Sequence, residues 1–251
     1  MPTFTTGLAK YAADGCLVKP LLIQYFQDPA NQPSFEVFFE PPRPRPPDGW
    51  FHASTHPLLN EADLVTYMRA PEKARREEFG ATAKIAVYFG TLMHEVTGHA
   101  LDQYGVTVPL PPGPCMACGR PRPKPGRRRR PGECGEHGAA DLSTRSRGHL
   151  DKILDFKMRG THGYDFKTIY GWGLSKVPDM DLEFFKQKWP NYWAQAQEYM
   201  RLTGLRRYIV LFMSLGSPWE FREFQFEFDP AHCAAVEAKY RRVLATTGVA
   251  A

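Results

Sequence analysis

The sequence predicts an α/β fold in which a central mixed β-sheet is flanked by helices. Several segments have apolar residues at helical spacing, and between them lie short runs rich in aromatic and branched residues, which are typical of strands. Glycine or proline separates the predicted helices from the predicted strands. With 251 residues, of which 43% are hydrophobic, the chain is long enough to bury a core. The predicted order is helices, strands, a helix, strands and a final helix.

The first part of the chain is predicted to be mainly helical. A helix is expected near residues 17–26, a strand near 34–40, and a proline-rich linker over 40–50. Helical spacing then runs from residue 60 to Gly105, with an interruption near Pro71. This long helical stretch contains two histidines, which become important below.

The last part of the chain combines strands and helices. Residues 148–158 and 164–170 are predicted to form a β-hairpin, joined by the turn-prone segment from Arg159 to Gly163. The elements expected after the hairpin are a helix at 182–203 ended by Gly204, strands at 206–215 and 219–229, and a helix at 230–245. Apart from a doubled tripeptide, no internal repeat is visible.

A basic, cysteine-containing insert separates the two parts. Between Cys115 and His137 there are seven Lys or Arg against two Glu, so 25 basic and 25 acidic residues remain elsewhere and the insert carries the whole net charge of +5. Such a patch is typical of nucleic-acid binding, and a solvated loop is the alternative. The arginines expected to contact phosphates are Arg127, Arg128, Arg129, Arg130, Arg145 and Arg147.

Four residues of the insert have the spacing of zinc ligands. Cys115 and Cys118 form one pair, Cys134 and His137 form the other, and fifteen residues lie between the pairs. In a reducing compartment this set favours metal ligation over disulfides. A structural zinc takes four sulfur and nitrogen ligands, and its binding would supply the folding energy that a segment with almost nothing apolar to pack lacks. We therefore predict a structural zinc site, with free cysteines as the alternative.

The composition favours a cytoplasmic protein without a membrane partner. The chain has no run of 18 or more apolar residues, the length that a membrane span needs. Its start, MPTFTTGLAKYAADG, lacks the basic and apolar regions of a secretory signal. From these two observations we expect that the protein is not an integral membrane protein.

The doubled tripeptide is Asp-Phe-Lys, which begins at Asp155 and again at Asp165. On a strand, Asp165 and Lys167 project from the same face, and an exposed ion pair is the simplest interpretation of that alone. Folding of the hairpin, however, is expected to bring Asp151 across from Asp165, so that two carboxylates converge beside one lysine. Magnesium and manganese prefer such oxygen ligands, and the combination indicates phosphodiester hydrolysis.

Four motifs, taken in chain order, resemble those of the PD-(D/E)xK nuclease superfamily, and within it the RecB-like exonucleases that include CRISPR-associated members and phage relatives. They are His94 in GTLMHEVTG, Gly148-His-Leu-Asp151, Asp165-Phe-Lys167-Thr168 and Gln195-Ala-Gln-Glu-Tyr199. The resemblance covers roughly residues 85–215 and implies a restriction-endonuclease-like core, with the zinc-ordered basic insert outside it. It also selects the second tripeptide, because Asp155 follows Asp151 too soon to leave a hairpin's length between them. Four residues of a strand span roughly 13 Å, so Asp155 could not share the metal of Asp151 and is expected at the far end of the hairpin.

The resemblance implies a role for each motif residue. Those it assigns to a magnesium or manganese ion are His94, Asp151, Asp165 and the backbone carbonyl of Phe166. Those it assigns to catalysis are Asp151, Asp165, Lys167, Gln195 and Tyr199, with Lys167 orienting the attacking water. The alternatives are a core histidine at His94, with His99 as its rival, and a merely packed helix face at Gln195 and Tyr199.

An iron–sulfur cluster is the alternative to zinc in the insert. RecB-like exonucleases often hold such a cluster, but its cysteines usually lie before the nuclease core and near the C-terminus. Here only Cys16 and Cys233 lie outside the insert. Zinc is therefore the preferred metal, although four ligands of an unusual cluster would fit the same residues.

The predicted function is that of a metal-dependent DNA exonuclease acting on DNA ends or single strands. A structure-specific endonuclease of the same superfamily and a non-catalytic, zinc-dependent nucleic-acid-binding protein are the alternatives. No helicase motif is present, so a helicase, recombination or replication partner would be a separate chain. The expected division is 1–58 for an N-terminal arm and helix, 59–110 for a helical part with His94, 111–138 for the zinc insert and 139–251 for the nuclease core.

Overall fold

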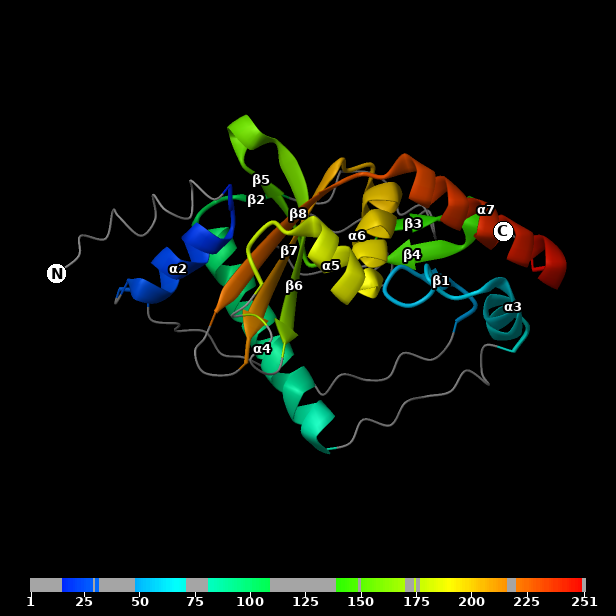
Figure 1. Ribbon diagram of the computed structural model, residues 1–251, viewed down its shortest axis with the longest axis horizontal. Helices are drawn as coiled ribbons and strands as arrows, with labels where there is room; N and C mark the ends of the chain where they lie inside the picture. Colours follow the sequence, from blue (N-terminus) through cyan, green and yellow to red (C-terminus); the bar gives the residue numbers. More distant parts are fainter. Residues whose placement is uncertain are drawn as a thin grey trace, which may run out of the picture.

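The computed structural model describes residues 15–28, 30–31, 48–70, 81–108, 139–148, 150–169, 174, 177–215 and 220–249. These segments form six α-helices and two mixed β-sheets, shown in Figure 1. The predicted strand at 34–40 lies outside them. So do the predicted zinc ligands and the central arginines of the insert, which are Cys115, Cys118, Cys134, His137, Arg127, Arg128, Arg129 and Arg130.

The larger sheet has five strands in the order β2-β5-β6-β7-β8. Strands β6 and β7 run parallel in its centre, and every other neighbouring pair is antiparallel. This confirms the predicted central mixed sheet. Its strands are β2 (Thr107–Val108), β5 (Lys152–Asp155), β6 (Thr161–Ile169), β7 (Arg207–Ser214) and β8 (Phe221–Glu227).

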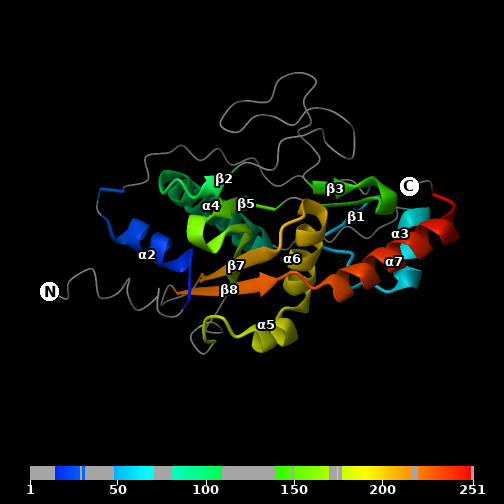
Figure 2. The same cartoon turned by 90° about the horizontal axis from the view of Figure 1, so that it is seen from above.

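Helices cover both faces of this sheet. Side chains alternate along its strands, and apolar residues point to both faces, so each face needs a covering layer. Ile209 and Leu211 on β7 belong to one buried cluster, and Val210 and Phe212 belong to another. Figure 2 shows the layers from the side, with α4 on one side of β7 and β8 and α5 on the other. The first cluster includes α2 (Lys19–Gln27) and α4 (Ala81–Gln103), and the second includes α5 (Leu182–Lys188) and α6 (Pro190–Thr203). None of the helices described has the length and apolar character that crossing a bilayer requires.

A small second sheet, which the sequence analysis missed, has the order β1-β4-β3. A third cluster of buried side chains, including Phe51, Leu64 and Tyr240, packs this sheet against two helices. Strands of two or three residues are too short to display an alternating pattern, so no periodicity revealed them. The elements are β1 (Phe51–His52), β3 (Ala139–Asp141), β4 (Ser146–Gly148), α3 (Glu61–Arg69) and α7 (Pro230–Thr247).

The hairpin is present, but its predicted boundaries were wrong. Its turn is a short 3-10 helix, η3 (Lys157–Arg159), followed by Gly160 at φ 76°, so β6 begins at Thr161. The first strand does not extend back to Gly148, because that residue pairs with Ala139 in the small sheet. Asp151 therefore lies directly before β5, where the chain has just passed from one sheet to the other.

The single helix predicted at 182–203 is in fact two helices. Proline has no amide hydrogen and disfavours helical geometry in the residue before it, which here is Trp189, at φ −130° and ψ 56°. Pro190 instead occupies the first turn of α6, a position that suits it. Gly204, at φ 75°, ends α6 as predicted.

His56, whose ring packs edge-on against Phe51 of the third cluster, should make the free energy of unfolding fall at acidic pH. Its ring is buried, its Nδ1 accepts the His52 amide hydrogen at 2.7 Å, and burial, followed by the charge of His52, lowers its pKa from 6.5 to about 4. The pKa of His56 is lower in the folded than in the unfolded state. The contribution of the neutral ring to the free energy of unfolding is therefore present above pH 6.5 and is lost as pH falls toward 4. The loss should reach about 3 kcal/mol. Urea unfolding between pH 7 and 4 tests this, with a shallower decline expected for His56→Gln; identical declines would contradict it.

Candidate active site

The β5–β6 hairpin places the two predicted acids next to each other. Its register pairs Lys152 with Tyr164 and Asp155 with Thr161. One step beyond the first of these pairs, Asp151 comes beside Asp165, close enough that each carboxyl group shifts the pKa of the other. The acid of the first tripeptide, Asp155, lies at the other end of the hairpin, as the sequence analysis expected.

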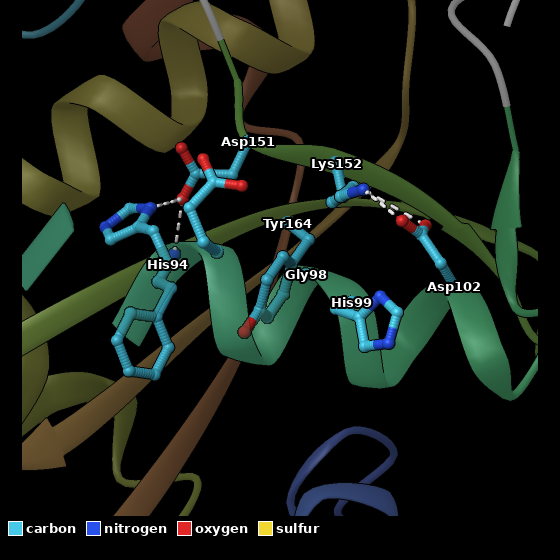
Figure 3. A pocket seen from close by; sticks show the side chains of 9 residues that line it. His94, Gly98, His99, Asp102, Asp151, Lys152 and Tyr164 are labelled. Carbon is cyan, nitrogen blue, oxygen red and sulfur yellow. Dashed lines mark hydrogen bonds and ion pairs between the residues drawn. The ribbon is translucent and has the colours of Figure 1, made fainter. Parts of the chain in front are cut away.

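Asp151 is held from two further directions. One of its oxygens, Oδ2, lies 3.0 Å from Nδ1 of His94 on α4, and the same oxygen accepts the backbone amide hydrogen of Phe166 at 2.8 Å, as Figure 3 shows. The His94 ring also packs edge-on against Phe166 at 5.2 Å. The structure therefore brings His94 into contact with Asp151, and Nε2 of its rival His99 lies 3.1 Å from Nε2 of Gln103.

The environments of the two acids move their pKa values in opposite directions. Burial raises the pKa of Asp165, which is 3% exposed, and Asp151 adds to this, so that its pKa reaches about 7 despite the opposing charge of Lys167. Burial also raises the pKa of Asp151, but the hydrogen bond and charge of His94 outweigh it and hold that pKa below its usual value. Without a metal, the pair thus tends to keep one proton on Asp165 near neutral pH.

Lys167 is the cation beside this pair. Its Nζ lies 2.5 Å from Oδ2 of Asp165 and 5.2 Å from the centre of the Tyr192 ring on α6. Burial lowers the pKa of Lys167, but the charge of Asp165 and the hydrogen bond to it outweigh this, so the pKa is raised. The lysine is therefore charged, and it points with Asp165 to the face covered by α6.

Gln195 and Tyr199 are buried on α6 and support the strand that leads to Asp151. Gln195 donates from Nε2 to the Tyr199 hydroxyl at 2.9 Å. The Tyr199 ring lies against the backbone of Gly148, where an added Cβ would come within 2.3 Å of the ring. Gly163 accommodates Tyr208 in the same way, and the two tyrosine rings stack at 5.9 Å. These residues therefore lie within the packing around the site.

A cavity of about 310 Å³ opens beside Asp151 and includes groups that sequence reasoning missed (Figure 3). Lys152 lies on its wall and binds both carboxylate oxygens of Asp102, at 2.9 and 3.0 Å. Gly98 on α4 lies under the Lys152 side chain, where an added Cβ would come within 3.2 Å of its Cε. The residues around the cavity are His94, Glu95, Gly98, His99, Asp102, Asp151, Lys152, Tyr164 and Phe166.

The donor chemistry of the site fits a hard divalent cation. It combines two carboxylates, an imidazole and the backbone at Phe166. Within the described residues, however, no three His, Cys, Asp or Glu side chains are gathered as a ready metal site. Asp151 contacts both His94 and Asp165, and a cation would compete with these contacts.

The remaining predicted DNA contacts lie in the small sheet or in the core. Arg145 and Arg147 both lie over the Trp50 ring, at 5.6 and 5.7 Å; Arg147 also pairs with Asp48, and Arg145 donates to the carbonyl of Gly49 at 3.1 Å. The aromatic side chain of Trp189, just before α6, packs against the second cluster.

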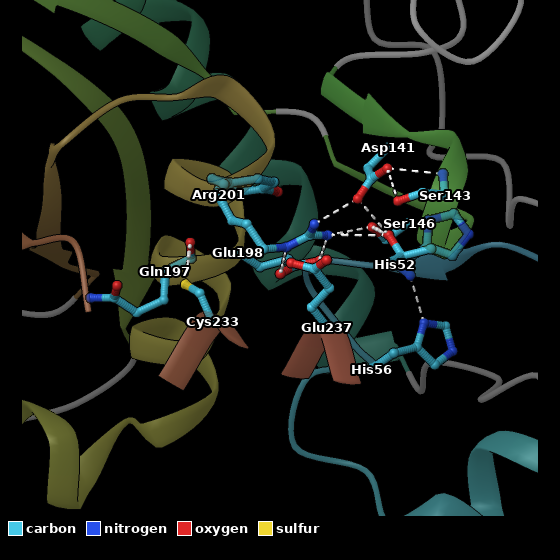
Figure 4. A network of polar contacts seen from close by, with 12 residues as sticks. His52, His56, Asp141, Ser143, Ser146, Gln197, Glu198, Arg201, Cys233 and Glu237 are labelled. Carbon is cyan, nitrogen blue, oxygen red and sulfur yellow. Dashed lines mark hydrogen bonds and ion pairs between the residues drawn. The ribbon is translucent and has the colours of Figure 1, made fainter. Parts of the chain in front are cut away.

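A buried polar network, also missed from the sequence, connects the small sheet to α6 (Figure 4). Arg201 donates to Glu198 at 2.8 Å, to Asp141 at 2.7 Å and to the hydroxyl of Ser146 at 2.5 Å. Glu198 is 2% exposed, so its charge depends on this partner. The network fixes β3 and β4 against the helix that carries Gln195 and Tyr199.

Comparison with known proteins gave structural similarities only. No family model matches the chain, and no curated protein matches it. The alkaline exonuclease LHK-Exo from Laribacter hongkongensis is similar at 17% identity, covering 80% of this chain and 88% of its own, with a TM-score of 0.46. Its complex with dAMP gives 15% identity, the same coverage and a TM-score of 0.45. The structure of SSO0001 gives 14% identity, 92% and 82% coverage and a TM-score of 0.37. Because these scores are below 0.5, the proposal that follows rests on the site itself.

Proposed function

We propose that this protein is a metal-dependent nuclease that hydrolyses phosphodiester bonds in DNA. The observation that carries the proposal is the meeting of Asp151 and Asp165 across the hairpin, with Lys167 at 2.5 Å from Asp165. A carboxylate pair with a charged lysine offers metal ligands and a group that can hold a water molecule or a phosphate oxygen. This is also the chemistry that the PD-(D/E)xK resemblance implies.

Each contact then has a defined task in the reaction. Before the ion binds, His94 and the Phe166 amide orient Asp151, so that its carboxylate stays ionised beside the buried Asp165. Lys167 orients the attacking water and its charge opposes the negative charge that develops on the phosphate. The chemistry that a bound magnesium or manganese ion supplies is a lower pKa for that water and neutralisation of the phosphate. Its ligands would be Asp151, Asp165, His94 and the Phe166 carbonyl.

We further propose that the insert holds DNA beside this site. Its support is the excess of seven basic over two acidic residues and the paired ligands Cys115, Cys118, Cys134 and His137, which suit a structural zinc. Arg145 and Arg147 lie on the small sheet, whose strand β4 leads toward Asp151, and a DNA contact there remains part of the proposal.

Linear and covalently closed circular DNA test the reaction class. An exonuclease should degrade linear DNA when magnesium or manganese is added and should leave closed circles intact, because it needs an end. Chelation by EDTA should stop the reaction, and products should be resolved on gels. Cutting of the closed circle would make the protein an endonuclease, and no metal-dependent cutting of either substrate would remove the nuclease proposal.

A further inference from the structure

A second cavity lies at the far end of the catalytic hairpin, away from the acid pair. Its volume is about 270 Å³, and elements distant in the sequence meet there. Arg159 comes from the hairpin turn, His162 from the start of β6 and Arg207 from the start of β7. The residues around it are Leu17, Arg159, His162, Met180, Arg207, Gln225, Phe226 and Glu227.

The two arginines give this cavity its positive charge, which Glu227, opposite Arg207 in the sheet, offsets in part. Both are exposed, and within the described segments neither forms an ion pair with a carboxylate. Arg207 donates from its guanidinium to the carbonyl oxygen of Arg159 at 2.6 Å, which fixes the two residues beside each other. Of the eight residues around the cavity, only Glu227 is acidic. The exposed Lys157 and Arg206 nearby add to the positive charge.

The floor of the cavity is rigid and is not itself charged. His162 is buried, and its Nδ1 lies 3.0 Å from the Gly160 carbonyl, to which it donates a hydrogen bond. Burial, followed by the charge of Arg207, lowers the pKa of His162, so this ring is neutral at neutral pH. The guanidinium groups therefore provide the charge that an incoming anion would meet.

The distance from this cavity to the acid pair suits a nucleic-acid strand. Val210, which neighbours Asp165 in the sheet, lies three residues after Arg207 on β7. Three residues of a strand span about 10 Å. Because a duplex rises about 3.4 Å per nucleotide along each strand, this separation corresponds to about three nucleotides.

We propose that this cavity is a phosphate-binding subsite for the DNA strand that is cut at the acid pair, with Arg159 and Arg207 as its ligands. Guanidinium groups match phosphate oxygens through paired hydrogen bonds, and both arginines are exposed at this cavity. The subsite would not distinguish between base sequences, and it would hold the DNA strand along the direction of β6 and β7. This inference rests on the proposed nuclease function.

Salt-dependent DNA binding tests the subsite without any cleavage. Affinity for a short duplex and a single strand should be measured by fluorescence anisotropy in EDTA, over a series of salt concentrations. Loss of one phosphate contact should reduce the slope of log affinity against log salt by about 0.9 for duplex DNA and about 0.7 for a single strand. Arg159→Gln and Arg207→Gln should each show this loss, and Arg159→Lys should restore most of the slope because it keeps the charge.

Arg241→Gln is the matched control, because Arg241 is an exposed arginine on α7, on the other side of α6 (Figure 1). It removes the same charge and should leave the slope unchanged. Arg159→Gln is the decisive variant, since the carbonyl that binds Arg207 is retained; its thermal unfolding should match the wild type. If the wild type binds and cuts DNA but Arg159→Gln has the slope of Arg241→Gln, this inference is wrong. If the wild type binds DNA without cutting it and the slope falls as expected, the nuclease proposal fails and the cavity is a phosphate-binding site of a DNA-binding protein, not a subsite for a strand that is cut.

Discussion

Replacing Asp165 by alanine should reduce metal-dependent degradation of linear DNA by about a thousandfold or more. The substitution removes a buried carboxylate that faces both Asp151 and Lys167. Loss of a metal ligand removes several kcal/mol of transition-state stabilisation, and about 4 kcal/mol corresponds to a thousandfold. The measurement is the initial rate on end-labelled DNA with magnesium or manganese.

The repeated tripeptide provides the control for this experiment. Asp155→Ala removes the same chemical group from the same sequence context, but Asp155 pairs with Thr161 at the opposite end of the hairpin. Its rate should stay within about twofold of the wild type, as is usual for surface substitutions. If Asp165→Ala and Asp155→Ala both retain the wild-type rate, then the acid pair is not catalytic or the activity belongs to a contaminant.

Arg201→Met should lower the free energy of unfolding by about 3 to 5 kcal/mol. Methionine fills a similar space, so the effect comes from the charge rather than from a cavity. Glu198, which is 2% exposed, would then keep a buried charge without the partner that now lies 2.8 Å away. Urea unfolding at neutral pH measures the change, and the native far-UV circular dichroism spectrum should be retained at low urea concentration.

The double variant Glu198→Gln with Arg201→Met separates charge from packing. Neutralising the glutamate should recover a large part of the lost stability, because the buried unpaired charge has gone. If the double variant is as unstable as Arg201→Met, the arginine acts through its contacts with Asp141 and Ser146 instead. DNA cleavage should decline in parallel with the folded fraction only.

The spacing of residues along the chain predicted the part of the site that lies within the hairpin. A hairpin turn fixes which residues of its two strands are opposite, so the approach of Asp151 to Asp165 follows from the number of residues between them. The preference for the second tripeptide has the same basis. Helical periodicity placed His94 on a helix, and the resemblance to a known family distinguished it from His99. The roles of these residues stay predictions.

The sequence did not predict contacts between polar groups that lie far apart along the chain. Glu223 on β8, for example, accepts hydrogen bonds from the amides of Leu17, Val18 and Lys19 at 2.7 to 2.9 Å, across more than 200 residues of chain. It satisfies the first turn of α2 in place of a local cap. The motif FREFQFE reveals a strand, but nothing in its spacing shows which distant amides its buried acid will meet. The contacts of Arg201 with the small sheet are of the same kind.

The hydrogen bond from the Phe166 amide to Asp151 gives the protein an internal spectroscopic probe. Since this backbone proton is shared with a side-chain oxygen, its NMR chemical shift and its rate of exchange with deuterium depend on where the Asp151 carboxylate lies. Titration with magnesium or manganese would therefore be visible at one backbone resonance in the middle of a strand. Diamagnetic magnesium suits the shift measurement, and the line broadening caused by manganese would locate the ion independently. Occupancy of the site becomes measurable without DNA and without turnover.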